Sequence, residues 1–394
     1  MVKKKSRHIG LWIVCVCFVM LGILFFTMSY SVANETPRVL EYNRSRLSEG
    51  VTFATYEKMP QVSFTDNLAL CGELNTETVD RIGEVKPSLV NEHFFDVYDI
   101  HVRGSGITED HVVNKTSAIV ISDNAARKMS LDGNVVGQTI SLFGKDFTIV
   151  GVYHKPDGFL RGISSDIFDR AYIPYTCYEG YGKQPLDTVA AKKGSYSEKA
   201  LPLLGMMSSD SGYYLENDLD IKHDMISNLP NLFVGFIAII LTVVVIRVII
   251  KMGKGAAKRL RETRKTEYFT GVLRRNWLYL LSRVLIAAAL IAVPVMLFIF
   301  FPPKLVIPQN YIPYDNIFEL NHYLDVFTSH IQQANSNLAM GNCYYQHLFG
   351  NAMLMLVPML LLLMTLSLVI TVRISKLVKN RRGWLKTLII PEKA

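Results

Sequence analysis

The sequence has few charged residues and lacks common motifs of catalytic sites. Only 19% of its 394 residues are charged, whereas 50% are hydrophobic, a balance that favours a membrane-associated protein. No G-x-x-x-x-G-K-[ST] motif occurs, which excludes a phosphate-binding loop of that kind. No G-x-S-x-G motif occurs either, so the usual serine hydrolase signature is missing. We therefore expect no catalysis on this chain and no cofactor.

Histidine and cysteine do not form a metal-binding pattern. Three scattered histidines, His101, His111 and His154, lack the paired spacing of a zinc site, and we expect them to be solvated or structural. Cys343 and His347 lie four residues apart, but no second pair of ligands stands nearby. We expect no metal at either place.

What the sequence does contain is four apolar runs long enough to cross a bilayer. About 20 helical residues, at roughly 1.5 Å per residue, cover the hydrocarbon thickness of about 30 Å. The only charges within the runs, Arg247 and Arg283, lie near ends where a long side chain can reach the headgroups. The predicted transmembrane helices are residues 9–30, 231–250, 277–301 and 351–372.

The first run has a competing interpretation as a cleavable signal peptide. The tripeptide Ser31-Val32-Ala33 has the small-x-small form of a cleavage site. The preceding apolar run of about 22 residues is longer than the usual apolar core of such a peptide. An uncleaved anchor therefore fits the sequence better.

The distribution of basic residues predicts the orientation. Lysine and arginine crowd residues 251–276 and 373–394, whereas residues 31–230 are acid-rich and residues 302–350 have Lys304 as their only basic residue. By the positive-inside rule, residues 1–8, 251–276 and 373–394 are cytoplasmic, and the other two segments are outside. The net charge of +8 thus follows topology, and we expect membrane lipids, not nucleic acid, as its counterpart.

Residues 31–230 have the pattern of a folded α+β domain. Expected strands are "EHFFDVYDIHV" (92–102), "SAIVIS" (117–122), "AYIPY" (171–175) and the turn-divided pair "QTISLFGKDFTIVGVY" (138–153). Residues 123–130 are expected as a helix capped by Asp123. A second lobe is expected at about 176–212, and Leu219, Ile226 and neighbouring apolar residues predict a helical stalk into the second span.

The two extracytoplasmic cysteines of this domain leave one question open. Cys71 and Cys177 would lie in a compartment where disulfides persist. The sequence does not give their separation, so a disulfide and two free thiols both remain possible.

The order of these motifs resembles the core domain of MacB-type ABC transporter permeases, within the wider FtsX-like group. The resemblance covers about residues 60–176 and implies a MacB-core-like α+β domain between the first and second of four transmembrane helices. It also implies a separate cytoplasmic ABC ATPase, a homodimer or paired permease, and a multi-pass location in a bacterial cell membrane. The matching positions are Phe94, Phe95, Gly106, Glu109, Asp110, Ala118–Ser122, Ala125, Ala126, Gly137 and Phe147–Val152.

The cytoplasmic loop departs from the family and indicates a divergent member. Family members carry a coupling segment resembling E-R-x-x-E-I-G-x-x-[RK]-A-x-G, whereas this loop reads "KRLRETRKTEYFTGVLRRN". The alternation of charge is kept, but the I-G and A-x-G elements are absent. The expected ATPase-coupling residues are Arg261, Glu262, Arg264, Glu267 and Tyr268.

Two functions of different class remain. The first is a permease subunit that couples ATP hydrolysis on a partner to movement of the external domain, for export, extraction or transmembrane signalling. The second is a membrane-anchored sensor or scaffold whose external domain binds a partner without an ATPase. An ABC ATPase in the neighbouring reading frame would favour the first.

Overall fold

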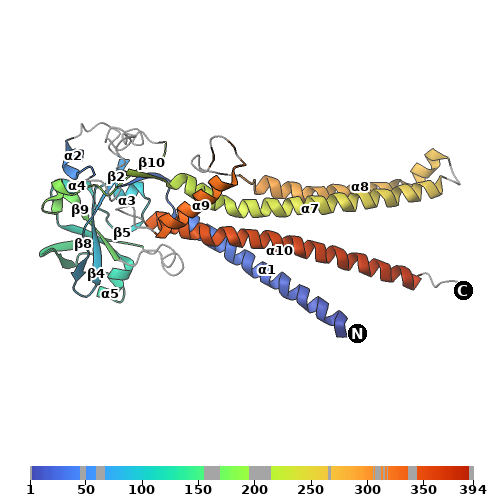
Figure 1. The fold of residues 1–394 in the computed structure, drawn as a ribbon, viewed down its shortest axis with the longest axis horizontal. Helices are drawn as coiled ribbons and strands as arrows, with labels where there is room; N and C mark the ends of the chain where they lie inside the picture. The colour runs from blue at the N-terminus through green and yellow to red at the C-terminus, as the bar shows by residue number, and fades with distance from the viewer. Residues whose placement is uncertain are drawn as a thin grey trace. The chain divides into compact units, whose positions relative to one another are not determined.

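An 11-stranded mixed sheet forms the centre of the part of the chain between the first and second long helices (Figure 1). The computed structural model describes residues 2–44, 50–58, 67–154, 169–194, 214–264, 268–304, 306, 312–313, 316, 318–335 and 344–389. The chain divides into two compact units. We call residues Ser31–Ile226 with Ile307–Leu354 the sheet domain, and Met1–Tyr30, Ser227–Val306 and Met355–Ala394 the helical unit.

Within the sheet the strands are not in sequence order. The order is β11-β1-β10-β2-β4-β9-β6-β8-β5, with β3 beside β4 and β7 beside β8. The pairs β4 with β9 and β6 with β8 are parallel, and the other pairs are antiparallel. The strands are β1 Val39–Arg44, β2 Leu68–Glu73, β3 Glu77–Val79, β4 Gly83–Val90, β5 Val102–Gly104, β6 Ala118–Ser122, β7 Thr139–Leu142, β8 Lys145–Tyr153, β9 Asp169–Pro174, β10 Thr188–Lys192 and β11 Tyr214–Asp218.

The long helices carry the apolar runs. Four described helices are long and apolar enough to cross a membrane, at Trp12–Glu35, Leu219–Thr263, Asn276–Phe300 and His347–Leu377, which confirms the predicted number of spans. The helices are α1 Val2–Glu35, α2 Phe53–Glu57, α3 Phe94–Val97, α4 Glu109–Val113, α5 Asp123–Met129, α7 Leu219–Thr263, α8 Phe269–Phe300, α9 Leu320–Asn335 and α10 Tyr344–Ile389, with short 3-10 helices η2 Tyr175–Cys177 and η3 Tyr181–Lys183.

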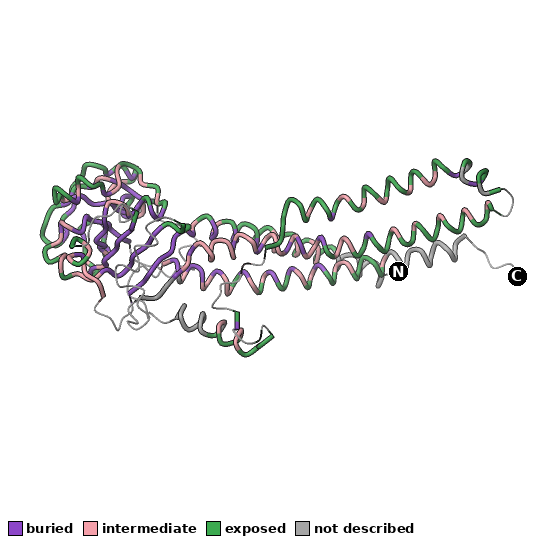
Figure 2. Tube along the Cα trace, turned by 90° about the horizontal axis from the view of Figure 1, so that it is seen from above, coloured by how far each residue is buried: buried purple, intermediate pink, exposed green. Residues whose placement is uncertain are grey.

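The core of the sheet domain lies along its central strands. Every residue of β6 is buried, as its continuous apolar run predicts. Figure 2 shows buried residues gathered in this domain, whereas much of the surface of the long helices is exposed. Exposed apolar side chains on those helices, such as Trp277 and Leu285, suit contact with lipid.

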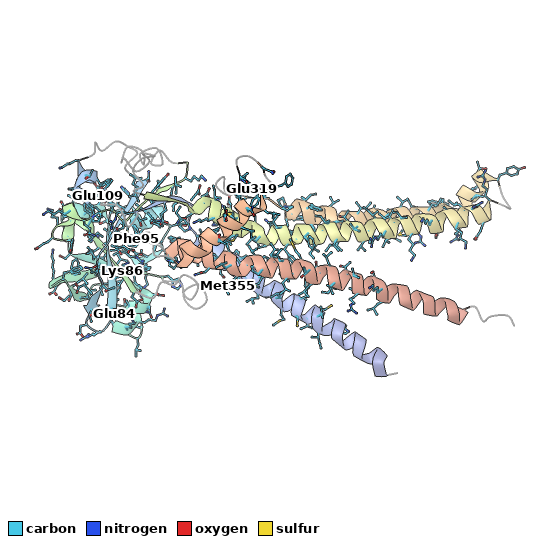
Figure 3. The ribbon with its side chains drawn as sticks, in the orientation of Figure 1. Glu84, Lys86, Phe95, Glu109, Glu319 and Met355 are labelled. Carbon is cyan, nitrogen blue, oxygen red and sulfur yellow. The ribbon has the colours of Figure 1, made fainter. Side chains whose placement is uncertain are left out.

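Buried ion pairs link strands β2, β4 and β9 of the sheet. The carboxylate of Glu73 on β2 contacts Arg170 of β9 and Lys86 of β4, and Figure 3 marks Lys86 within the domain. Burial by itself would raise the pKa of Glu73, but the charges of Arg170 and Lys86 outweigh it and lower the pKa below its ordinary value. Asp187 pairs similarly with Arg44 at 2.6 Å.

The expected strand at residues 92–102 is wrong in its first half. Residues 94–97 form α3, and only Val102 belongs to a strand, β5. In a strand, Phe94 and Phe95 would point to opposite faces. One helical turn instead brings Phe94 beside Tyr98, with ring centroids 4.9 Å apart, and allows both phenylalanines to contact Tyr172. Aromatic packing therefore decided the local structure.

The helix expected at 123–130 forms as α5, but its cap is Ser122 and not Asp123. The Ser122 hydroxyl accepts a hydrogen bond from the backbone N–H of Ala125 at 3.0 Å. Asp123 lies one residue inside the helix, where its carboxylate pairs with Arg127 and His154. An acidic residue is still favourable there because it faces the positive end of the helix dipole.

The hairpin predicted at 138–153 is confirmed. Leu142 pairs with Lys145, and the two residues between them, Phe143 and Gly144, have φ of 53° and 72°. Two central residues with positive φ define a type I′ turn. The Phe143 ring lies 5.5 Å from that of Tyr178, which helps hold a bulky residue in this conformation.

We expect Gly144→Val to lower the free energy of unfolding of this hairpin by about 1 kcal/mol or more. A Cβ at this position would meet no atom within 4 Å, so the cost comes from the backbone conformation alone. Gly144→Asn, which tolerates positive φ, should cost less and serves as the control. Hydrogen exchange of β7 and β8 in the full chain measures the effect, and equal protection in both variants would contradict the turn assignment.

Candidate functional site

The basic segment, residues 251–276, spans the end of α7 and the start of α8. Arg261 and Glu262 lie in the last turn of α7, and Arg264 follows it; all are exposed. Tyr268 precedes α8 and is 90% exposed. Glu267 lies outside the described residues. The structure thus leaves the described candidate coupling side chains accessible to a partner.

The described candidates are neighbours along the chain but do not form a cluster. Glu262 lies 3.9 Å from Lys258, one turn earlier on the same helix, and both side chains are largely exposed. A pair of this kind contributes only about 0.3–0.5 kcal/mol to stability. The cost of breaking it to contact a partner is correspondingly small.

A cluster that sequence reasoning missed lies close to this segment. The guanidinium carbons of Arg259 on α7 and Arg283 on α8 lie 4.4 and 5.0 Å from the centroid of the Tyr279 ring. The i to i+4 spacing of Tyr279 and Arg283 was a detectable signal. The approach of Arg259 from another helix was not.

A second missed cluster lies within the sheet domain. We call Glu41, Tyr98, Asn217, Lys222 and Tyr345 the helix-root cluster. Glu41 is fully buried on β1 and accepts hydrogen bonds from the Tyr98 hydroxyl at 2.8 Å and from the Asn217 amide at 2.7 Å. Burial raises the pKa of Glu41 above its ordinary value, although these donors and the nearby charge of Lys222 oppose the shift.

The first turns of α7 and α10 contact the residues that bind this carboxylate. Lys222 on α7 donates to the side-chain oxygen of Asn217, and its ammonium lies 4.9 Å from the centroid of the Phe349 ring on α10. The Tyr345 ring stacks on Tyr98 with centroids 5.8 Å apart. Segments far apart in sequence are therefore tied together by one buried polar group.

The end of α1 is bound to the same helices. Its Glu35 carboxylate lies 3.4 Å from the Tyr344 hydroxyl of α10. The carbonyl of Thr36, just after α1, lies 3.0 Å from the His223 ring of α7. Arg38 pairs with Asp220 and Asp224 of α7 at 3.5 and 3.2 Å. These contacts connect the first two turns of α7 to the end of α1 and the residues that follow it.

Two of the three scattered histidines of the sheet domain, His111 and His154, have structural partners. His111 caps α4 through contacts with Thr108, and His154 pairs with Asp123 at 2.8 Å. Among the described residues, no group of three or more side chains is arranged to hold a metal ion. The Cys343 and His347 pair cannot be described because Cys343 lies outside the described residues.

The two described cysteines of the sheet domain, Cys71 and Cys177, are free thiols in the structure. Cys71 lies on β2 and Cys177 in η2, and both are buried. Burial raises the pKa of the Cys71 thiol, and the Cys177 thiol donates to the carbonyl of Thr116 at 2.8 Å. Neither is positioned as a reactive thiolate.

Comparison with known proteins gives one family match. The profile of the MacB-like periplasmic core domain matches residues 10–200. No curated protein matches the sequence significantly. Among solved structures, the periplasmic region of MacB from Actinobacillus actinomycetemcomitans is 14% identical, over 49% of this chain and 94% of that chain, with a TM-score of 0.38.

Two further solved structures show similarity of the same order. The extracellular domain of the noncanonic ABC-type transporter YknZ from Gram-positive bacteria is 15% identical, over 42% of this chain and 87% of that chain, with a TM-score of 0.32. A permease-protein domain from Porphyromonas gingivalis is 17% identical, over 47% and 91%, with a TM-score of 0.30.

The family match coincides with the expected architecture. The matched residues begin in α1 and extend through β10, so they include the first candidate span and most of the sheet domain. Three further candidate spans follow, as in a multi-pass membrane protein. Residues 10–200 of the chain therefore carry a MacB-like periplasmic core domain, whose described strands lie between the first two candidate spans.

Proposed function

We propose that this chain is a permease subunit that converts ATP hydrolysis on a separate cytoplasmic ATPase into movement of the sheet domain. That movement would serve export, extraction or transmembrane signalling. In this proposal both termini and the basic segment are cytoplasmic, the membrane is that of a bacterial cell, and the chain works as a homodimer or with a second permease. The nucleotide chemistry belongs to the partner, and the substrate is left open.

The continuity of α7 is the observation that carries this proposal. This single helix runs from Leu219, next to the helix-root cluster, to Thr263 in the basic segment. Its 45 residues correspond to about 68 Å at 1.5 Å per residue. In this proposal, force that the ATPase applies at Arg261 is transmitted along this helix to Lys222. Lys222 contacts Asn217 and Phe349 of the sheet domain.

The composition of the spans favours force transmission over a conduit. The charged residues in the apolar stretches of α7 and α8, Arg247 and Arg283, lie toward the basic segment. A pathway for a polar solute needs a polar lining through its whole length. The described spans hold no charged residue in their central parts.

The sensor or scaffold function is the alternative, since an exposed basic segment would also be attracted to anionic lipid. Affinity capture of the full chain in mild detergent separates the two. We expect an ABC ATPase to co-purify in near-stoichiometric amount and to be lost when residues 261–268 are replaced by a Gly-Ser linker. Recovery of a soluble external partner without any ATPase would favour the alternative.

The orientation gives a separate prediction. In a cysteine-free variant, a cysteine at Arg264 should resist an impermeant thiol reagent in intact cells, whereas one at Asn321 in α9 should react, because the spans place them on opposite sides. Both native side chains are exposed in the structure, so accessibility within the fold does not differ. Labelling at Arg264 in intact cells would overturn the orientation.

A further inference from the structure

Two arginines from different helices converge on one aromatic ring without a described acidic partner. Arg259 and Arg283 lie within 5.0 Å of the Tyr279 ring centroid. Among the described residues, neither guanidinium has a carboxylate within 4.0 Å. The one ion pair described in this stretch joins Lys258 to Glu262. The negative face of the ring attracts both cations but carries no net charge.

The register of α7 and α8 shows that these residues share one face. Figures 1 and 2 show the two helices running side by side. A Cβ on Gly235 of α7 would come within 3.0 Å of Pro303, just beyond α8. Arg259 lies 24 residues after Gly235, and Tyr279 lies 24 residues before Pro303. The two contacts therefore define one antiparallel register.

This register places an open surface opposite Arg283. Gly255 is one helical turn before Arg259 on α7, and Arg283 is one turn after Tyr279 on α8, so the two lie at the same level. A Cβ at Gly255 would meet no atom within 4 Å. Unfilled space is thus present on α7 at the level of Arg283.

The chemistry of the pair selects an oxyanion. Two guanidinium groups held near one ring repel each other, and a shared anion relieves that repulsion. The planar fork of arginine matches the oxygens of a phosphate in a bidentate manner. Because no described carboxylate is near enough to hold a choline or ethanolamine cation, the site favours a headgroup with net negative charge.

The depth of the site favours a lipid as the source of that phosphate. Arg283 lies seven residues inside the candidate span Asn276–Phe300, about 10 Å along the helix axis. Trp277, 54% exposed near the same end of the span, is a residue type enriched at the membrane boundary. We propose that Arg259, Tyr279 and Arg283 bind the phosphate group of an anionic phospholipid in the leaflet next to the basic segment.

The test uses the full chain in mild detergent, with binding of phosphatidylglycerol followed by native mass spectrometry. Wild type should bind phosphatidylglycerol in preference to phosphatidylcholine. Arg259→Gln and Arg283→Gln should each weaken binding about fivefold, the effect of roughly one basic residue at a lipid surface. Tyr279→Leu should weaken it similarly although the net charge is unchanged. No ATPase is needed, so the outcome is independent of the proposed function.

Arg274→Gln is the matched control, since it removes the same charge from an exposed position on α8. It should leave binding within twofold of wild type. Equal loss in this control, or full binding by Tyr279→Leu, would show a diffuse basic surface and overturn the site. Displacement of the lipid by millimolar inorganic phosphate would assign the site to a free anion and overturn the lipid proposal. Loss of ATPase capture in Arg283→Gln with unchanged lipid binding would assign the arginines to the protein partner instead.

Discussion

Replacing Glu41 with alanine should lower the stability of the sheet domain by about 3 kcal/mol or more. The Glu41 side chain is fully buried, and its carboxylate accepts from Tyr98, Asn43 and Asn217. The substitution leaves three buried donors without an acceptor and removes the negative charge beside Lys222. Each unsatisfied buried donor costs about 1–3 kcal/mol, with losses that overlap within one network. Hydrogen exchange of β1 and β10 in the full chain measures the change.

Two variants show whether the hydrogen bonds cause the effect. Tyr98→Phe removes one donor and leaves the acceptor, so it should cost only about 1 kcal/mol. Glu84→Ala, at an exposed position, should fall within about 0.5 kcal/mol of wild type. A loss in Glu41→Ala no larger than that of Glu84→Ala would contradict a structural role for the helix-root cluster.

The same carboxyl group predicts a pH dependence. Burial raises the pKa of Glu41 in the folded state above its ordinary value of 4.5. The folded chain therefore holds this proton more tightly than the unfolded chain. The resulting stabilisation is fully present below pH 4.5 and is lost as the pH rises through the folded-state pKa. Glu41→Gln should lack this change, so its stability relative to wild type should improve as the pH rises across that interval.

The second large effect is expected from charge reversal in the basic segment. Under the proposed function, Glu262→Lys with Glu267→Lys places positive charge against basic residues of an ATPase groove, which should abolish co-purification of the ATPase and the transport-linked phenotype. Under the sensor or scaffold alternative, the added lysines strengthen attraction to anionic lipid by about 1 kcal/mol each. The chain should reach the membrane in both cases, so the two models predict opposite results for ATPase capture.

A matched variant controls for the change of net charge. Glu84→Lys with Glu109→Lys introduces the same number of charges at exposed positions, which Figure 3 shows at the rim of the sheet domain. This control should keep the ATPase at the wild-type level. If the Glu262 and Glu267 variant also keeps it, and deletion of a neighbouring ATPase gene is silent, the permease proposal fails.

Features that depend on short-range patterns could be predicted from the amino-acid sequence. A membrane span is a local run of apolar residues, so all four were predictable from length and composition. The hairpin at Phe143 and Gly144 followed from alternation around a glycine turn. The run Ala118–Ser122 was recognisable as a buried strand. The positive charge of the basic segment could also be predicted from the sequence, although its residues 265–267 are not described.

Tertiary structure decided what depends on partners far away in the chain. Nothing in residues 92–98 indicates that Phe94 and Phe95 will pack on Tyr172, and that contact favours a helical turn where alternation favoured a strand. Strand β10 lies between β1 and β2, although β1 and β2 are much nearer to each other in sequence. Local periodicity specifies which face of a strand is buried but not which strand lies beside it.

The candidate sites show the same division for a physical reason. A carboxylate can be buried only where donors satisfy it, and those of Glu41 come from β1, the end of α3 and β11. A pair of arginines on one ring requires two helices in a particular register, which is fixed by packing between α7 and α8. The sequence could therefore indicate which segments are polar, apolar or charged, but only the folded chain determined which of those groups meet.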